Sequence, residues 1–234
     1  MKNLLFIPIL FFTLWHQAQS IADQATYLND LKSEMQKEWP KNRILNIVFH
    51  GHSVPAGYFK TPQVNTLGAY PNLLLKKLKV IYPLAVVNVI VTAIGGENSV
   101  KGAERFERDV LIHKPDLLLI DYSLNDRGVG LEKAYSAWNQ MIKSAKDQDI
   151  KVILLTPSPD QKVNYADPEN DLKKHADQIR KIAAKNQIGL VDSYQAFEFL
   201  YPDKEQLSNY MSQVNHPNEL GHELIANELI RWFQ

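Results

Sequence analysis

The chain has no cysteine among its 234 residues. It can therefore form no disulfide, cannot use a thiol nucleophile, and has no cysteine that could carry a lipid anchor. It also lacks an excess of either charge, because 26 Lys and Arg residues balance 26 Asp and Glu residues. This balance leaves no electrostatic footprint for nucleic acid or for an anionic membrane surface. A small, roughly neutral substrate fits the composition better.

Long apolar runs are missing as well. The run from Leu4 to Trp15 is too short to span a bilayer. It follows the cationic start Met1-Lys2-Asn3 and precedes Ala18-Gln19-Ser20, whose small residues suit a signal peptidase. We therefore predict a secretory signal peptide over residues 1–20 and a periplasmic or secreted mature chain that is not stably inserted in a membrane. An uncleaved membrane anchor is the alternative.

Residues 21–234 are predicted to form a single domain in which helices and strands alternate. The chain is 45% hydrophobic and 22% charged, which is ordinary for a globular protein. Apolar runs without polar alternation predict strands over residues 43–50, 85–91, 116–121, 150–156 and 189–192. Helical spacing of apolar residues, or a polar amphipathic pattern, predicts helices over residues 22–37, 70–82, 103–112, 131–148, 171–186 and 219–233, the last capped by Asn218.

Strands of this kind, separated by helices, form a parallel sheet that is covered on both faces. The predicted fold is therefore α/β, a three-layer α/β/α sandwich with a five-stranded parallel sheet. In such a sheet the functional groups lie at the carboxyl ends of the strands. Four segments follow or approach these ends, namely residues 50–57, 92–99, 122–127 and 208–218. The irregular stretch over residues 156–168 is predicted to be a rim loop.

Ser53 lies on a glycine-bearing turn directly after the first predicted strand, where the hydroxyl would be presented to a crevice. His216, in the His-Pro-Asn segment before the last helix, is the natural general base. The other reading of each residue is structural, because Ser53 could shape a turn and His216 could be an ordinary loop histidine. His50, His113, His175 and His222 are predicted to be structural or exposed.

Taken together, the four segments resemble the SGNH or GDSL-type esterase family, which is named for residues in four separate blocks. In this chain the matching residues are Ser53, Gly96 in the Gly95-Gly96 turn, Asn125 and His216. The resemblance implies a flavodoxin-like SGNH hydrolase fold. It also implies an oxyanion hole formed by the backbone N–H groups of Ser53 and Gly96 and the side-chain amide of Asn125. Asp126 is predicted to cap the start of a helix, which leaves Asn125 for a functional role.

Two residues depart from the family pattern. His52 stands where the motif has aspartate, and Gln213 stands three residues before His216, where the family has its acid. Glutamine cannot offset the charge of an imidazolium. Either a backbone carbonyl orients His216, with Gln213 as a possible further orienting group, or an acid from elsewhere reaches it. The candidate acids are Asp203, Glu205 and Asp192.

The predicted function is that of a serine esterase acting through an acyl-enzyme, most simply a carbohydrate O-acetyl esterase. The alternatives are a lysophospholipase or thioesterase, and an α/β glycan-binding protein with weakened catalysis. No metal or cofactor is expected, because no close set of His, Asp and Glu ligands occurs in the sequence. The Gly-x-Ser-x-Gly elbow and the glycine spacings of P-loop and dinucleotide sites are not found either.

Overall fold

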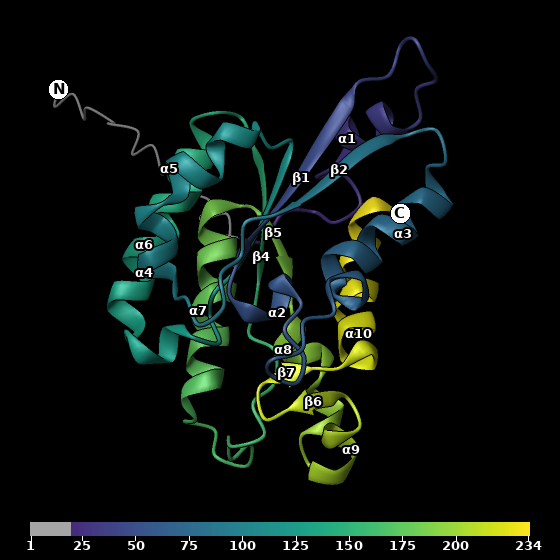
Figure 1. Ribbon diagram of the computed structural model, residues 1–234. Helices are drawn as coiled ribbons and strands as arrows, with labels where there is room; N and C mark the ends of the chain where they lie inside the picture. Colours follow the sequence, from purple (N-terminus) through teal and green to yellow (C-terminus); the bar gives the residue numbers. More distant parts are fainter. Residues whose placement is uncertain (1–19) are drawn as a thin grey trace, which may run out of the picture.

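A computed structural model describes residues 20–234, so that residues 1–19 of the predicted signal peptide lie outside the described residues. The central sheet contains β1 (Ile44–Gly51), β2 (Val86–Val91), β3 (Leu117–Asp121), β4 (Lys151–Leu155) and β5 (Gly189–Val191). Its strands are all parallel, in the order β2-β1-β3-β4-β5 (Figure 1). This is the flavodoxin-like order, and it confirms the predicted fold.

Helices cover both faces of the sheet (Figure 1). One face carries α3 (Tyr70–Ile81) and α10 (Glu219–Ile230), and the other carries α4 (Ser99–Glu104), α5 (Phe106–Asp109), α6 (Leu131–Lys146) and α7 (Asp171–Asn186). The smaller elements are α1 (Asn29–Met35), α2 (Ser53–Ala56), α8 (Ser193–Ala196), α9 (Lys204–Ser208), and the antiparallel pair β6 (Met211–Gln213) and β7 (His216–Pro217).

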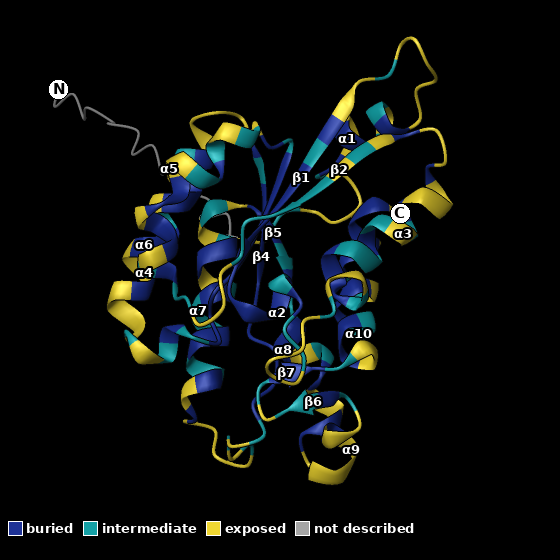
Figure 2. Cartoon of the chain, viewed as in Figure 1, coloured by how far each residue is buried: buried dark blue, intermediate teal, exposed yellow. Residues whose placement is uncertain are grey.

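The core consists of two apolar clusters, one on each face of the sheet. In β1, Ile47 and Phe49 join the cluster that also contains residues of α3 and α10, whereas Val48 joins the cluster beneath α6 and α7. β3 and β4 are buried along nearly their whole length, and β1 is buried beyond its exposed start (Figure 2). Burial on both faces explains why these strands read as continuous apolar runs.

Several predicted helix boundaries are wrong. The predicted 103–112 helix is instead the two helices α4 and α5, because Asn98 caps an earlier start by accepting from Lys101 N–H and because the backbone leaves helical geometry at Arg105. The predicted 22–37 helix is reduced to α1, and the last helix ends at Ile230 before a short 3-10 turn. The Asn218 cap is confirmed, since its side chain accepts from the N–H groups of Leu220 and Gly221.

No helix within residues 20–234 is long and apolar enough to cross a membrane.

Candidate active site

The serine turn begins where β1 ends. Ser53 is the first residue of α2, and its side chain is largely buried, with 7% of the residue exposed. The turn is held by His52, whose Nδ1 accepts from Val54 N–H at 3.2 Å. A Cβ atom at Gly51 would collide with the backbone carbonyl of Asp121 on the neighbouring strand. Glycine therefore lets β1 end close against β3, which places the serine at the carboxyl edge of the sheet.

His216 meets the serine from the β6–β7 ladder. Its Nε2 lies 2.8 Å from Ser53 Oγ, and its Nδ1 lies 2.9 Å from the backbone carbonyl oxygen of Phe59. A carbonyl can only accept, so this contact favours a hydrogen on Nδ1 and leaves the Nε2 lone pair facing the hydroxyl. Burial lowers the pKa of His216, and the bond to Phe59 opposes that shift only in part. The imidazole is therefore neutral near pH 7, as a general base must be.

Gln213 also contacts the imidazole. Its Nε2 lies 2.6 Å from His216 Nδ1, and its Oε1 accepts from the backbone N–H of Thr61 at 3.1 Å. Because the oxygen is taken by Thr61, the amide turns its NH₂ group toward His216. An NH₂ group can only donate, so it competes with the Phe59 carbonyl for Nδ1 and favours the opposite tautomer. The structure thus brings Gln213 to the base, but as a competing donor.

The three candidate acids lie elsewhere. Asp192 accepts from Arg180 Nε at 2.7 Å and from Thr156 Oγ1 at 2.9 Å. Asp203 caps the start of α9, the exposed helix that contains Glu205. Within residues 20–234, no ion pair joins His216 to a carboxylate. The geometry therefore favours the Ser–His dyad oriented by a backbone carbonyl.

Gly96 and Asn125 come together in the loops that follow β2 and β3. Gly96 has a φ of 77°, a conformation that favours glycine. The Asn125 amide donates one hydrogen to the backbone carbonyl of Glu97 at 2.8 Å, which ties the two loops to each other. The same nitrogen carries a second hydrogen that can serve a substrate oxygen. The loops that hold the two predicted donor residues thus lie at the carboxyl edge of the sheet, where β1 also presents Ser53.

Sequence reasoning missed the buried partners of His52. The His52 Nε2 lies 3.3 Å from Asp121 Oδ1, and Tyr70 Oη donates to Asp121 Oδ2 at 3.0 Å. Since Nδ1 accepts from Val54, the ring hydrogen lies on Nε2, close to the carboxylate but without a well-formed hydrogen bond to it. An aspartate at position 52 would face a second carboxylate here. The position of Asp121 at the end of the third predicted strand was the available signal.

Asp126 does serve a helix start, but the helix is α4, which precedes it in the sequence. Its buried carboxylate accepts from Ser99 N–H at 2.8 Å and from Trp138 Nε1 at 2.6 Å. It therefore serves the first turn of α4, and the following long helix α6 is capped at Gly130 without a side-chain bond. Burial raises the pKa of Asp126, and its hydrogen bonds offset part of that rise. The carboxylate acts as a link between the Asn125 loop and α4.

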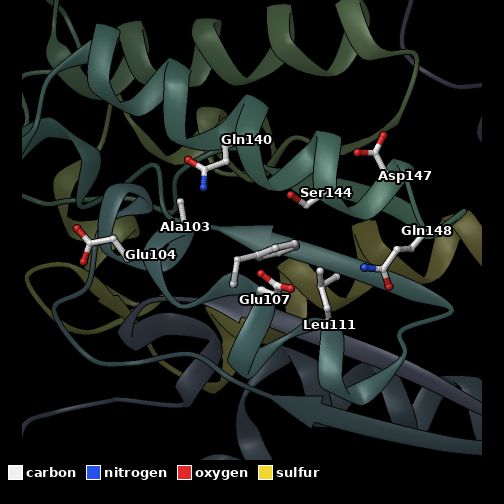
Figure 3. A pocket seen from close by; sticks show the side chains of 9 residues that line it. Ala103, Glu104, Glu107, Leu111, Gln140, Ser144, Asp147 and Gln148 are labelled. Carbon is white, nitrogen blue, oxygen red and sulfur yellow. The ribbon is translucent and has the colours of Figure 1, made fainter.

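Two surface cavities lie apart from the dyad. One, of about 360 Å³, is a trough between the α4–α5 segment and α6, with Glu104, Glu107 and Asp147 around it (Figure 3). The other, of about 540 Å³, is lined by residues of the 163–168 loop and by Tyr194 and Tyr201. Neither is lined by the serine or the histidine. Within residues 20–234, no group of three or more His, Asp or Glu side chains is arranged to hold a metal ion.

Comparisons with known proteins agree with the fold and with the family resemblance. A family model, described as the GDSL-like lipase/acylhydrolase family, matches residues 49–224, as the resemblance predicted. Axe2, an acetylxylan esterase from Geobacillus stearothermophilus, is 22% identical with a TM-score of 0.70, and the match covers 81% of this chain and 94% of Axe2. A two-domain esterase (CEX) active on acetylated mannans is 20% identical with a TM-score of 0.74, and the match covers 92% of this chain and 54% of CEX. A search of curated proteins gave no match. At these identities the structural similarity establishes the fold.

Proposed function

Since the chain belongs to the GDSL-like lipase/acylhydrolase family and is a serine hydrolase of ester bonds, we propose that it removes O-acetyl groups from a carbohydrate. Ser53 is the nucleophile and His216 is the general base. The observation that carries this assignment is the 2.8 Å contact between His216 Nε2 and Ser53 Oγ, with Nδ1 oriented by the Phe59 carbonyl. This arrangement activates a hydroxyl without an acid.

The reaction proceeds through an acyl-enzyme. Ser53 Oγ attacks the ester carbonyl while its proton passes to His216 Nε2. The resulting oxyanion is bound by the backbone N–H groups of Ser53 and Gly96 and by the Asn125 amide. The intermediate then collapses, the ester C–O bond breaks, and His216 returns the proton to the departing alcohol. A water molecule then attacks the acyl-enzyme carbonyl while its proton passes to His216 Nε2. The bond between the acyl carbon and Ser53 Oγ breaks, His216 returns the proton to Ser53 Oγ, and the acid is released.

The choice of an acetylated glycan is supported by the comparisons and by the surroundings of the dyad. Axe2 is an acetylxylan esterase and CEX is active on acetylated mannans. The formal net charge of +0 suits a neutral polymer. The ring centroid of Tyr58 lies 6.2 Å from that of His216, and the same ring packs against Gly95 in the loop after β2. An aromatic wall beside the base suits a sugar ring or a short acyl group.

A secreted or periplasmic location belongs to the same proposal. It rests on the sequence pattern of residues 1–20 and agrees with a polymeric substrate outside the cytoplasm.

A panel of esters tests the substrate class. Nitrophenyl esters from acetyl to palmitoyl should be compared with acetylated xylo-oligosaccharides and manno-oligosaccharides, with Ser53→Ala as the inactive control. We expect the highest kcat/KM on acetyl esters, together with release of acetate from the oligosaccharides. Activity confined to long acyl chains would identify a lysophospholipase or thioesterase instead. Glycan binding without turnover would identify a binding protein.

A further inference from the structure

Glu97 occupies the position directly after Gly96, in the loop between β2 and α4. Its backbone carbonyl accepts from the Asn125 amide at 2.8 Å. The residue is therefore bonded to one predicted oxyanion donor and covalently adjacent to the other. Any displacement of Glu97 moves both donors relative to Ser53.

The carboxylate of Glu97 is bound by two residues outside its own loop, Arg105 after α4 and Tyr122 after β3. Arg105 Nε donates to its two oxygens at 2.8 and 3.0 Å, and Arg105 Nη2 donates as well. Tyr122 Oη donates to Glu97 Oε2 at 2.7 Å. The Glu97 and Arg105 side chains are only 10% and 9% exposed. A forked guanidinium and a phenol thus fix one carboxylate in a single orientation.

The partners of Glu97 are themselves immobilised. Tyr122 is fully buried, its ring fills the space beside Gly102 where a Cβ would stand, and its hydroxyl lies 3.2 Å from His50 Nε2. Arg105 Nη1 also reaches Asp109 at 3.4 Å. These contacts anchor the loop to β1, β3 and α4.

A buried ion pair is a poor source of net stability, because desolvating two charges offsets much of their attraction. Such a pair is better explained by a need for fixed geometry. An oxyanion hole has this need, since its donors must lie at hydrogen-bond distance from an oxygen that becomes charged only during the reaction.

We propose that Glu97 is a positioning residue of the oxyanion hole, clamped by Arg105 and Tyr122 so that Gly96 and Asn125 face the developing charge. This inference rests on the proposed function. It assigns Glu97 no contact with substrate. Glu97 acts through Gly96, its neighbour in the chain, and through Asn125, which donates to its carbonyl.

A double-mutant cycle tests the proposal. Glu97→Gln keeps the size of the side chain but removes its charge. The ion pair with Arg105 is then lost, and the loop that contains Gly96 becomes more mobile. We expect kcat on an acetyl ester to fall about tenfold, with KM within about twofold, because the donors act mainly in the transition state. Asn125→Ala alone should lower kcat by roughly 10²–10³. In the Asn125→Ala background, Glu97→Gln should cost only about threefold, because one of the two donors that it positions is already missing.

The matched control is Glu104→Gln on α4. Glu104 forms an exposed ion pair with Lys101 and does not contact the loop, so kcat should be unchanged. If Glu97→Gln does not fold, Tyr122→Phe replaces it in the cycle. That variant removes the hydroxyl that donates to the carboxylate and that also contacts Arg105 and His50, but it leaves the ion pair. We expect a loss of about threefold that shrinks in the Asn125→Ala background.

The outcomes separate this inference from the proposed function. Equal losses in both backgrounds, a loss confined to KM, or the same loss in Glu104→Gln would overturn the positioning role and leave the esterase assignment intact. An Asn125→Ala variant with full kcat would overturn both the proposed oxyanion hole and the role of Glu97.

Discussion

Replacing Gln213 with aspartate should raise the activity of this enzyme. At present the NH₂ group of Gln213 lies 2.6 Å from His216 Nδ1 and competes with the Phe59 carbonyl, which accepts from the same nitrogen at 2.9 Å. A carboxylate at position 213 can accept from Nδ1–H. It would therefore favour the productive tautomer and stabilise the imidazolium that forms when Ser53 loses its proton.

The size of the gain follows from the kind of bond that is made. A hydrogen bond to a charged group contributes about 1.5–3 kcal/mol. Since about 1.4 kcal/mol corresponds to a tenfold change in rate, kcat/KM should rise by roughly 10- to 100-fold. Gln213→Ala removes the competing donor without adding charge, so kcat/KM should stay within about threefold of the unmodified enzyme or rise slightly.

The assay is hydrolysis of a soluble acetyl ester by Gln213→Asp, Gln213→Asn and Gln213→Ala. Gln213→Asn is the matched control, because it has the length of aspartate without its charge. The reasoning would be refuted if the aspartate variant were no faster than the asparagine variant. It would also be refuted if Gln213→Ala were folded but inactive, since the Gln213 side chain would then orient the base itself.

Three further predictions concern other ionisable groups. His52→Asp should lower the free energy of unfolding, measured by chemical denaturation, by about 3 kcal/mol or more, because it places a buried carboxylate against Asp121. His52→Asn keeps an acceptor for Val54 N–H and should lower it by less than half as much. The kcat/KM of the unmodified enzyme should rise with pH through a midpoint below about 6.5 and then level off, because burial lowers the pKa of the base His216. The free energy of unfolding should fall as the pH is lowered from 6.5 to 4.5. Burial lowers the pKa of His50 and His222 to about 3 in the folded state, so the unfolded chain binds more protons in this window. Each of the two residues should lower the free energy of unfolding at pH 5 by about 2 kcal/mol relative to its value at neutral pH.

Each of these has a clear contrary result. Equal destabilisation by His52→Asp and His52→Asn would show that Asp121 does not select the imidazole. A midpoint of kcat/KM above pH 7 would contradict a buried neutral base. A melting temperature that stays constant between pH 6.5 and 4.5 would show that the buried histidines do not control acid stability.

The sequence allowed the sheet and the dyad to be predicted because both have local signatures. The strands are buried on both faces, so they appear as unbroken apolar runs. Ser53 follows the end of the first run, and His216 lies in the segment that leads into the last helix. The orientation of His216 could not be predicted in the same way. The acceptor at Phe59 is a backbone carbonyl, which every residue has, so nothing in the sequence distinguishes it.

Long-range contacts account for the other omissions. Glu97 and Tyr122 are 25 positions apart, and only the parallel pairing of the strands brings their loops together. Asp126 was predicted to serve a helix start, but which helix it serves depends on tertiary structure, because its carboxylate accepts from the first residue of α4 and not from the helix that follows it. The break between α4 and α5 at Arg105 was hidden for the same reason, since the side chain of Arg105 belongs to the Glu97 cluster and not to the surface of a regular helix.

Covalent labelling tests most directly whether Ser53 is the nucleophile. The mature protein should be treated with an organophosphonate probe and weighed intact by mass spectrometry, with turnover of an acetyl ester measured on the same samples. We expect one label for each chain, loss of turnover in step with labelling, and neither label nor turnover in a folded Ser53→Ala variant. Turnover retained by Ser53→Ala would contradict the assignment of the nucleophile and, with it, the proposed mechanism.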